Sequence, residues 1–231
     1  MATRASETWP AQAPSGEVLY WEHPYSENDS LPHQARLMVA SADGPPRELL
    51  ATRARCDHSG GELPPTRAQL RCPARGDCVL GEADGTRLVF TAFNLRQGRG
   101  AELLRLENPG RGGTGWDLSR DGTRLVIPGM NGAVKLVELG AAGRSVDRYL
   151  QHGCELQHLA FNAEGNGLFA TAVCGGDRPY TLFFVELHRS AQVLWDSSST
   201  WFGFPTVSPD GRFLAFAVRP LDNDVWVASG L

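Results

Sequence analysis

The residues best suited to binding a ligand lie in one stretch, Trp195–Phe204, with the sequence Trp-Asp-Ser-Ser-Ser-Thr-Trp-Phe-Gly-Phe. Aromatic rings beside small hydroxyl groups can form a platform on which a sugar or a peptide stacks. The same rings also suit a connection between strands whose aromatic side chains fill the hydrophobic core. Both interpretations stay open, and the candidate binding residues are Trp195, Asp196, Trp201 and Phe202.

The histidines suggest a second chemistry, metal binding. His152 and His158 stand on either side of the start of a predicted repeat, so both could face a central channel and hold a metal ion or a carboxylate. They fit surface or turn positions as well. A channel metal needs inward ligands from several repeats, and no such residue recurs at one position of the repeats. We therefore predict no metal and no other cofactor.

Catalytic motifs are missing from the sequence, which contains neither Gly-x-Ser-x-Gly nor His-Glu-x-x-His. Residues 110–115 have the spacing Gly-x-Gly-x-x-Gly, but a dinucleotide site needs that loop between a strand and a helix. Here a predicted strand, Trp116-Asp117-Leu118, follows the loop. We interpret 110–115 as a connection between repeats and predict no catalytic residue.

A sequence motif typical of β-hairpin turns recurs along the chain. Because each hairpin turn joins two strands, short strands must position these residues. The clearest copy of the motif is Ser208-Pro209-Asp210-Gly211-Arg212, followed by an apolar run. Proline presets φ, the acidic side chain accepts hydrogen bonds from backbone amides, and glycine adopts the positive φ that closes the turn. The predicted turn residues are Asp84 and Gly85, Asp121 and Gly122, Glu164 and Gly165, and Asp210 and Gly211.

The spacing of these acidic-glycine pairs indicates the fold class. They begin 37, 43 and 46 residues apart, and repeats of about 40–50 residues built from short strands are typical of propeller blades. The strands after the turns, such as 125–127 and 213–218, are continuously apolar, which indicates that both of their faces are covered. We predict an all-β protein, a β-propeller of about five four-stranded blades.

The predicted propeller domain covers residues 17–231, after a flexible N-terminal segment at 1–16 that lacks the apolar region of a secretory signal. The last blade, at about 204–228, has no obvious fourth strand. Because an open sheet edge is an aggregation hazard, a terminal segment near 8–18 could complete this blade. Alternatively, the chain is an incomplete arc of a larger propeller.

Charge and hydropathy argue against two classes of partner. The formal net charge is −4, whereas a nucleic-acid surface needs a basic stripe. The longest apolar runs, such as 213–218, are too short to cross a bilayer. We expect neither a nucleic-acid partner nor membrane insertion by this segment.

The cysteines suggest a disulfide. Cys72 and Cys78 flank a turn-like segment, 73–77, and side chains that face each other across a hairpin can meet disulfide geometry. The alternative is two unpaired buried thiols. A disulfide here favours an oxidising compartment, periplasmic or extracellular, and the total of five cysteines leaves at least one thiol free.

With the repeats laid out, the chain resembles the TolB-like family of bacterial propeller repeats. The resemblance is carried by Ser208–Arg212 and its variants at Asp121-Gly122 and Asp84-Gly85, and it covers about 68–231. The segment 71–103 also resembles the propeller that follows a serine/threonine kinase or winged-helix DNA-binding domain in large bacterial proteins. This resemblance implies a C-terminal sensor or interaction propeller, with an effector domain that is missing from this chain.

Three functions are consistent with these features. The first is a non-catalytic module that binds a protein or small-molecule ligand at one face of the propeller, where loops converge on a rigid scaffold. The second is a hydrolase or lyase with a metal bound in the channel. The third is a structural fragment that completes a larger propeller.

Overall fold

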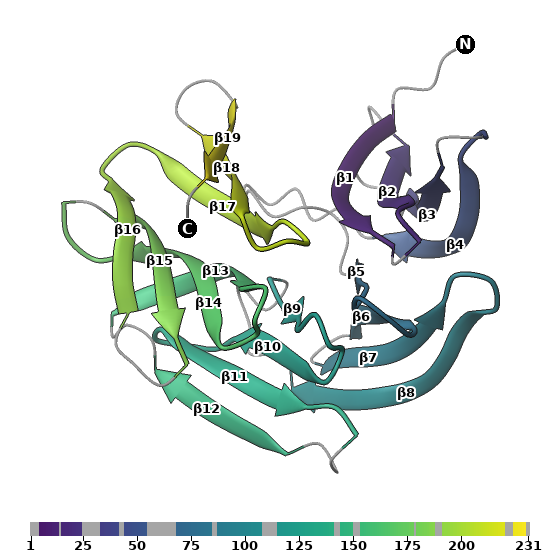
Figure 1. The fold of residues 1–231 in the computed structure, drawn as a ribbon, viewed down its shortest axis with the longest axis horizontal. Coiled ribbons are helices and arrows are strands. Elements are labelled where there is room, and N and C mark those ends of the chain that lie inside the picture. Colours follow the sequence, from purple (N-terminus) through teal and green to yellow (C-terminus); the bar gives the residue numbers. More distant parts are fainter. Residues whose placement is uncertain are drawn as a thin grey trace. The chain divides into compact units, whose positions relative to one another are not determined.

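The computed structural model describes residues 5–13, 15–24, 33–41, 44–54, 68–84, 87–107, 115–140, 144–149, 153–177, 179–187, 191–219 and 224–229. The regular structure of these residues consists of 19 β-strands, with no helix among them. The strands form five antiparallel sheets in which each strand pairs with the next one along the chain, as in the blades of a propeller. The fold is thus that of an all-β propeller, as predicted, and Figure 1 shows the strands of each sheet.

The chain divides into two compact units, and the first, Met1–Leu106, contains two sheets. One sheet consists of β1 (Ala5–Gln12), β2 (Val18–Pro24), β3 (His33–Ala40) and β4 (Arg47–Ala54). The other consists of β5 (Ala68–Arg71), β6 (Cys78–Asp84), β7 (Arg87–Asn94) and β8 (Gly98–Glu107).

The second unit, Glu107–Leu231, contains three sheets. The first is formed by β9 (Asp117–Leu118), β10 (Arg124–Pro128), β11 (Ala133–Glu138) and β12 (Ser145–Tyr149). The next is formed by β13 (Cys154–Phe161), β14 (Gly167–Cys174), β15 (Tyr180–Glu186) and β16 (Ala191–Ser197). The last has three strands in the described part of the chain: β17 (Trp201–Val207), β18 (Phe213–Arg219) and β19 (Asp224–Ser229).

The predicted turn phrase forms the first hairpin of each sheet in the second unit. Gly122, Gly165 and Gly211 have φ values of 75°, 71° and 73°, the left-handed region that glycine enters without steric cost. In each turn a side-chain oxygen also accepts a hydrogen bond from the backbone N–H five residues later. These bonds join Ser119 to Arg124 at 2.9 Å, Asn162 to Gly167 at 2.9 Å, and Ser208 to Phe213 at 3.0 Å.

The pair Asp84 and Gly85 is not a copy of this turn, contrary to the prediction. Asp84 pairs with Arg87, so Asp84 ends the second strand of its sheet and Arg87 begins the third, whereas Gly85 lies outside the described residues. The equivalent turn is Cys72–Cys78, in which Gly76 has a φ of 94°. Counted from Gly76, the turn glycines stand 46, 43 and 46 residues apart, a more regular repeat than predicted.

The first sheet contains a copy of the turn that sequence analysis missed. Ala13-Pro14-Ser15-Gly16 takes the place of Ser-Pro-Asp-Gly between β1 and β2; Gly16 has a φ of 91°, and its N–H donates to the Ala13 carbonyl at 2.9 Å. The segment predicted to be a flexible lead-in therefore includes a strand, β1, which pairs with β2 from Ala5 opposite Pro24 to Gln12 opposite Val18. This strand belongs to the first sheet, not to the last.

The continuously apolar strands belong to sheets that are covered on both faces. Successive side chains of a strand point to opposite sides, so one apolar run fills the layers on both sides of its sheet. On β14, Leu168 and Ala170 pack toward the sheet of β9–β12, in a cluster that includes Val126. Phe169, between them, packs toward the sheet of β17–β19, beside Leu214. In the first unit, Trp21, Leu37, Leu80 and Phe93 belong to the layer between its two sheets.

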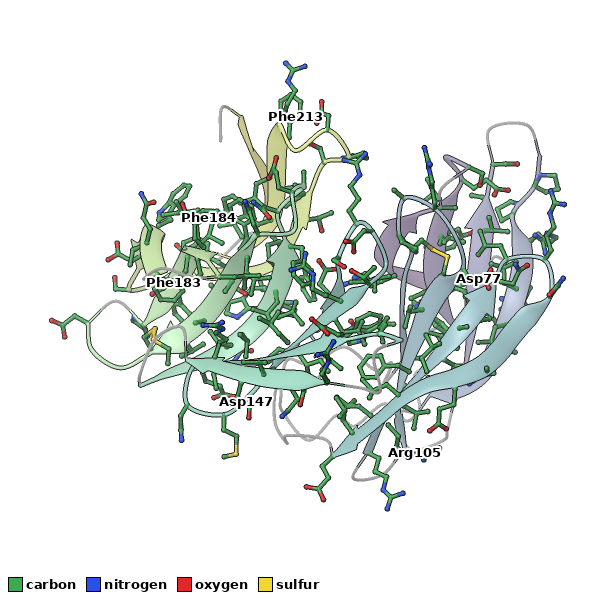
Figure 2. All side chains as sticks on the ribbon, turned by 60° about the horizontal axis from the view of Figure 1, so that its bottom comes forward. Asp77, Arg105, Asp147, Phe183, Phe184 and Phe213 are labelled. Atoms are coloured by element: carbon green, nitrogen blue, oxygen red, sulfur yellow. A yellow bond between two sulfur atoms is a disulfide. The ribbon has the colours of Figure 1, made fainter. Side chains whose placement is uncertain are left out.

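Two disulfides tie neighbouring strands (Figure 2). The predicted bond between Cys72 and Cys78 is confirmed and closes the hairpin between β5 and β6. A second bond, which sequence analysis did not predict, joins Cys154 to Cys174, opposite each other on β13 and β14. The fifth cysteine, Cys56, lies outside the described residues.

Candidate functional site

The four predicted binding residues do not share one surface. Neighbouring residues of a strand face opposite sides, and Trp201 and Phe202 follow each other on β17. Phe202 is only 2% exposed and belongs to the layer between β13–β16 and β17–β19. Trp195, on β16, is 49% exposed and packs against one edge of that layer. Its ring centroid lies 5.7 Å from that of Phe202 and 6.2 Å from that of Phe216. Asp196 lies opposite Thr181 of β15.

Trp201 belongs to a different group, which we call the His158 cluster: His158, Trp201, Phe204 and Arg219. The His158 ring lies 4.1 Å from the Phe204 ring and 5.7 Å from the Trp201 ring, centroid to centroid. The rings of Trp201 and Phe204 are 5.8 Å apart in an edge-to-face arrangement. The Arg219 guanidinium carbon lies over the Trp201 ring, 5.6 Å from its centroid, within the range of a cation–π contact.

Two features of the β17 backbone form this cluster. The pairing of β17 with β18 shifts register between Gly203 and Thr206, and such bulges re-aim side chains. Within the bulge, Phe204 has a φ of 51°, an outlier for a bulky residue, and it precedes Pro205, which disfavours helical conformations at the residue before it. Gly203 leaves room for the indole, because a Cβ there would clash with the Trp201 ring.

The neighbouring strand β13 is held by hydrogen bonds to the segment that contains β9. Leu159 N–H donates to the Gly115 carbonyl at 3.1 Å, and Phe161 N–H donates to the Asp117 carboxylate at 2.8 Å. Gly115 is needed here because a Cβ would clash with the backbone of Gln157. These bonds join the first strands of two neighbouring sheets, which fixes the position of β13 and of the His158 backbone.

The cluster combines a buried polar ring with accessible aromatic and cationic groups. His158 is 8% exposed, and its Nδ1 lies 3.4 Å from the hydroxyl of Thr171 on β14. Trp201 and Phe204 are half-buried, and Arg219 is exposed. Arg219 and Trp201 are register partners at the end of the sheet remote from its turn. Such a set of groups can bind an apolar or aromatic ligand and attract negative charge.

The turn acids stabilise their own turns. The pKa of Asp121 is lowered from 3.8 to about 2, chiefly by the hydrogen bond from the Ser119 hydroxyl at 2.6 Å and next by the Thr123 backbone N–H. The pKa of Asp210 is also lowered, first by the Ser208 hydroxyl, which donates to it at 2.6 Å. The geometry agrees with the structural role predicted for these acids.

The remaining histidine predictions have mixed outcomes. His158 lies on a strand and is buried, so it is not an ordinary turn or surface histidine. His152 lies outside the described residues. Among the described residues, no three His, Cys, Asp or Glu side chains are grouped so that they could hold a metal ion. The part of the chain described here also contains no helix long and apolar enough to span a membrane.

Of the cluster members, His158 was considered only as a possible metal or carboxylate ligand, Phe204 only as the end of the aromatic stretch, and Arg219 was not predicted at all. The local signal for Phe204 was the run Gly203-Phe204-Pro205, since glycine inside a strand pattern often marks a bulge, and proline in a sheet is confined to edges, strand starts and bulges. No comparable local signal exists for His158 or Arg219, because their proximity to Trp201 arises only when β13, β17 and β18 pack together.

Comparison with known proteins gives the fold and no family. No family model matches the sequence, and no curated protein matches it. A provisionally named TolB from Agrobacterium tumefaciens has a similar structure, with a TM-score of 0.64 and 14% identity over 97% of this chain and 77% of that one. Hydrazine synthase from Kuenenia stuttgartiensis gives a TM-score of 0.59 and 12% identity over 96% of this chain.

A third similar structure is a provisionally named 6-phosphogluconolactonase from Bacteroides uniformis, with a TM-score of 0.55 and 8% identity over 96% of this chain and 67% of that one. The present chain spans 62% of the length of the hydrazine synthase chain. Because the identities are so low, these likenesses show a shared β-propeller fold, including that of a TolB propeller, and assign no activity.

Proposed function

We propose that this chain is a non-catalytic, TolB-like propeller module that binds a ligand or a protein partner, and that the His158 cluster is part of its binding surface. The observation that carries the proposal is the conformation of Phe204. A bulky residue with a φ of 51° costs roughly 1–3 kcal/mol, and such strain gathers at functional sites. Here it turns an aromatic ring onto His158, next to Trp201.

The chemistry of the cluster favours binding over catalysis. Its members are two carbocyclic or indole rings, an imidazole that is almost entirely buried, and one guanidinium. A hydrolytic site would need a nucleophile or a metal-bound water next to a base. A sensor role in a larger signalling protein, which the resemblance to kinase-linked propellers implies, would use the same kind of ligand-binding surface.

The proposal can be tested with melting temperatures in the presence of defined probes. A suitable panel contains acetylated aromatic dipeptides, aromatic carboxylic acids and monosaccharides. A ligand present at about a hundredfold excess over its Kd adds about 2.7 kcal/mol to the stability, which raises the Tm of a chain of this size by about 5–10 °C. We expect at least one probe class to raise the Tm of the wild-type chain.

Two adjacent residues provide the variant and its control. Trp201→Ala should abolish the probe-induced shift, since the ring belongs to the cluster. Phe202→Ala should preserve the shift while it lowers the stability by about 3–5 kcal/mol, because it empties a buried ring position. If Trp201→Ala keeps the full shift, the His158 cluster is not the binding surface and the proposal fails.

A further inference from the structure

The turn between β5 and β6 differs from its counterparts in what holds it closed. In the turns of Asp121 and Asp210, the acid before the glycine accepts hydrogen bonds from its own turn. Between β5 and β6 the disulfide Cys72–Cys78 closes the turn instead, and the residue before the glycine is Arg75. The charged side chains of this turn are therefore not needed to close it.

This turn presents a cation and an anion to solvent, one on each side of a glycine. Residues 74–77 are all exposed. Gly76 has a φ of 94°, which reverses the chain between Arg75 and Asp77, and a Cβ placed on it would meet no atom within 4 Å. In the part of the chain that the structure describes, no group forms an ion pair or a hydrogen bond with the Arg75 side chain. The guanidinium can bind an acidic group without the loss of such a contact.

Asp77, in contrast, is held in one orientation (Figure 2). Its Oδ1 accepts a hydrogen bond from Nδ2 of Asn94, at the end of β7, at 2.8 Å. Asn94 is fixed in turn, because its own Oδ1 accepts from the backbone N–H groups of Arg96 and Gln97 at 3.0 and 3.1 Å. No described group donates to the second oxygen of Asp77, Oδ2. The carboxylate thus offers one oxygen from a fixed position.

A single open oxygen favours a metal ion over a guanidinium as the counterpart of Asp77. The arginine fork matches both oxygens of a carboxylate at once, and Asn94 already occupies one of them. Ca²⁺ and Mg²⁺ accept a single carboxylate oxygen, and a hydrogen bond to the other oxygen orients such a ligand. The described residues contain no group of three His, Cys, Asp or Glu that could hold a metal ion, so the partner must hold it.

We propose that the turn 73–77 is a docking loop for a partner protein whose surface holds a divalent cation beside an acidic pocket. Asp77 completes the coordination of the cation, and Arg75 enters the pocket. The disulfide and Asn94 hold the loop in place, which reduces the entropy lost on binding. The His158 cluster belongs to the other compact unit, and this inference does not depend on the function proposed for it.

The test is surface plasmon resonance with the full chain immobilised. The probe is a purified integrin ectodomain, an extracellular protein of this surface chemistry. We expect binding in Mg²⁺ that disappears in EDTA and that the peptide Gly-Arg-Gly-Asp-Ser competes away. Asp77→Asn should abolish binding, because it removes the charge of the metal ligand and keeps its shape. Asn94→Ala should weaken binding about ten- to a hundredfold, the usual cost of losing a group that orients a ligand.

The matched control is the double variant Arg75→Asp with Asp77→Arg, which keeps the composition, the net charge and Gly76 but reverses the order of the charges. It should not bind, and its Tm shows whether it is folded; if it does not fold, Asp77→Asn decides. Binding that persists in EDTA would assign the partner's cation to a side chain and overturn the inference. No binding of the wild type in Mg²⁺, or full binding by Asp77→Asn or by the reversed variant, would overturn it as well.

Discussion

The acids of the turns carry charge that stabilises the fold, and Asp121 is the clearest case. Its carboxylate accepts from the Ser119 hydroxyl and from the backbone and hydroxyl of Thr123. Its pKa in the folded chain is about 2, below the ordinary 3.8. Because the folded pKa is lowered, the stabilisation is fully present above about pH 4 and is lost as the pH falls toward 2.

We therefore expect Asp121→Asn to destabilise the chain near pH 6 by about 1 kcal/mol, a figure reduced for the solvent screening of an exposed group. The difference from the wild type should shrink as the pH approaches 2.5, measured by urea unfolding at both pH values. Glu164→Gln is the control, because that turn is closed by the amide groups of Asn162 and Asn166, 2.7 Å apart. A destabilisation that is the same at both pH values would contradict this account.

The residues of the candidate site could be predicted only in part. The sequence pointed to the aromatic stretch, but it could not separate Trp201 from Phe202, since that separation depends on which face of β17 each residue occupies. The bulge after Gly203 then brings Phe204 toward His158. A local pattern cannot place β13 beside β17, so the partners of Trp201 had to come from the packed structure.

At the scale of the elements, the same hairpin turn is held by a side-chain hydrogen bond in one sheet and by a disulfide in another. In the last sheet the Ser208 hydroxyl holds the backbone of Phe213. In the sheet of β5–β8 the corresponding positions are Cys72 and Cys78, whose disulfide joins the same two strands. The acidic-glycine pair at Asp84 belongs to the next hairpin of this sheet, so it was the wrong signal for this turn. The sequence signal for this turn is Pro73, directly after Cys72, together with Gly76, two residues before Cys78.

The two disulfides should contribute unequally to stability, because loop-closure entropy increases with loop length. The Cys154–Cys174 bond spans 20 residues and the Cys72–Cys78 bond spans 6. Replacing both cysteines of a pair with serine should cost about 3 kcal/mol for the longer loop and about 2 kcal/mol for the shorter one. Denaturant unfolding of both double variants checks the order, and a larger loss for the Cys72–Cys78 pair would contradict it.

At the scale of the whole molecule, the repeat determined most of the fold. Each sheet needs a tight first turn and strands that are apolar on both faces, and both requirements are visible in sequence. The turn of the first sheet was not predicted because Ser15 stands where the turns at Gly122, Gly165 and Gly211 have an acid. Strand β1 escaped with it, since 1–16 is polar and proline-containing and so is typical of a loop.

The edges of the sheets differ in charge, and this difference predicts where copies of the chain associate. The fourth strands β8 and β12 carry charged side chains, including Arg105 and Asp147 (Figure 2), and such charges protect sheet edges from pairing. On β16 the consecutive residues Val193, Leu194 and Trp195 are exposed without a charge between them, Val193 by 52%. An uncharged, apolar edge strand is a site of self-association.

We expect the sedimentation of the wild-type chain to show a weight-average mass that rises above 25.1 kDa as the concentration increases. Val193→Lys should keep the mass at the monomer value, because a lysine on the edge opposes strand pairing. Val146→Lys is the matched control, since Val146 is 55% exposed on β12 beside Asp147. The edge of β16 is not the site of association if the wild type stays monomeric or if both lysine variants behave alike. An effect confined to Val193→Lys would instead assign self-association to the edge of β16.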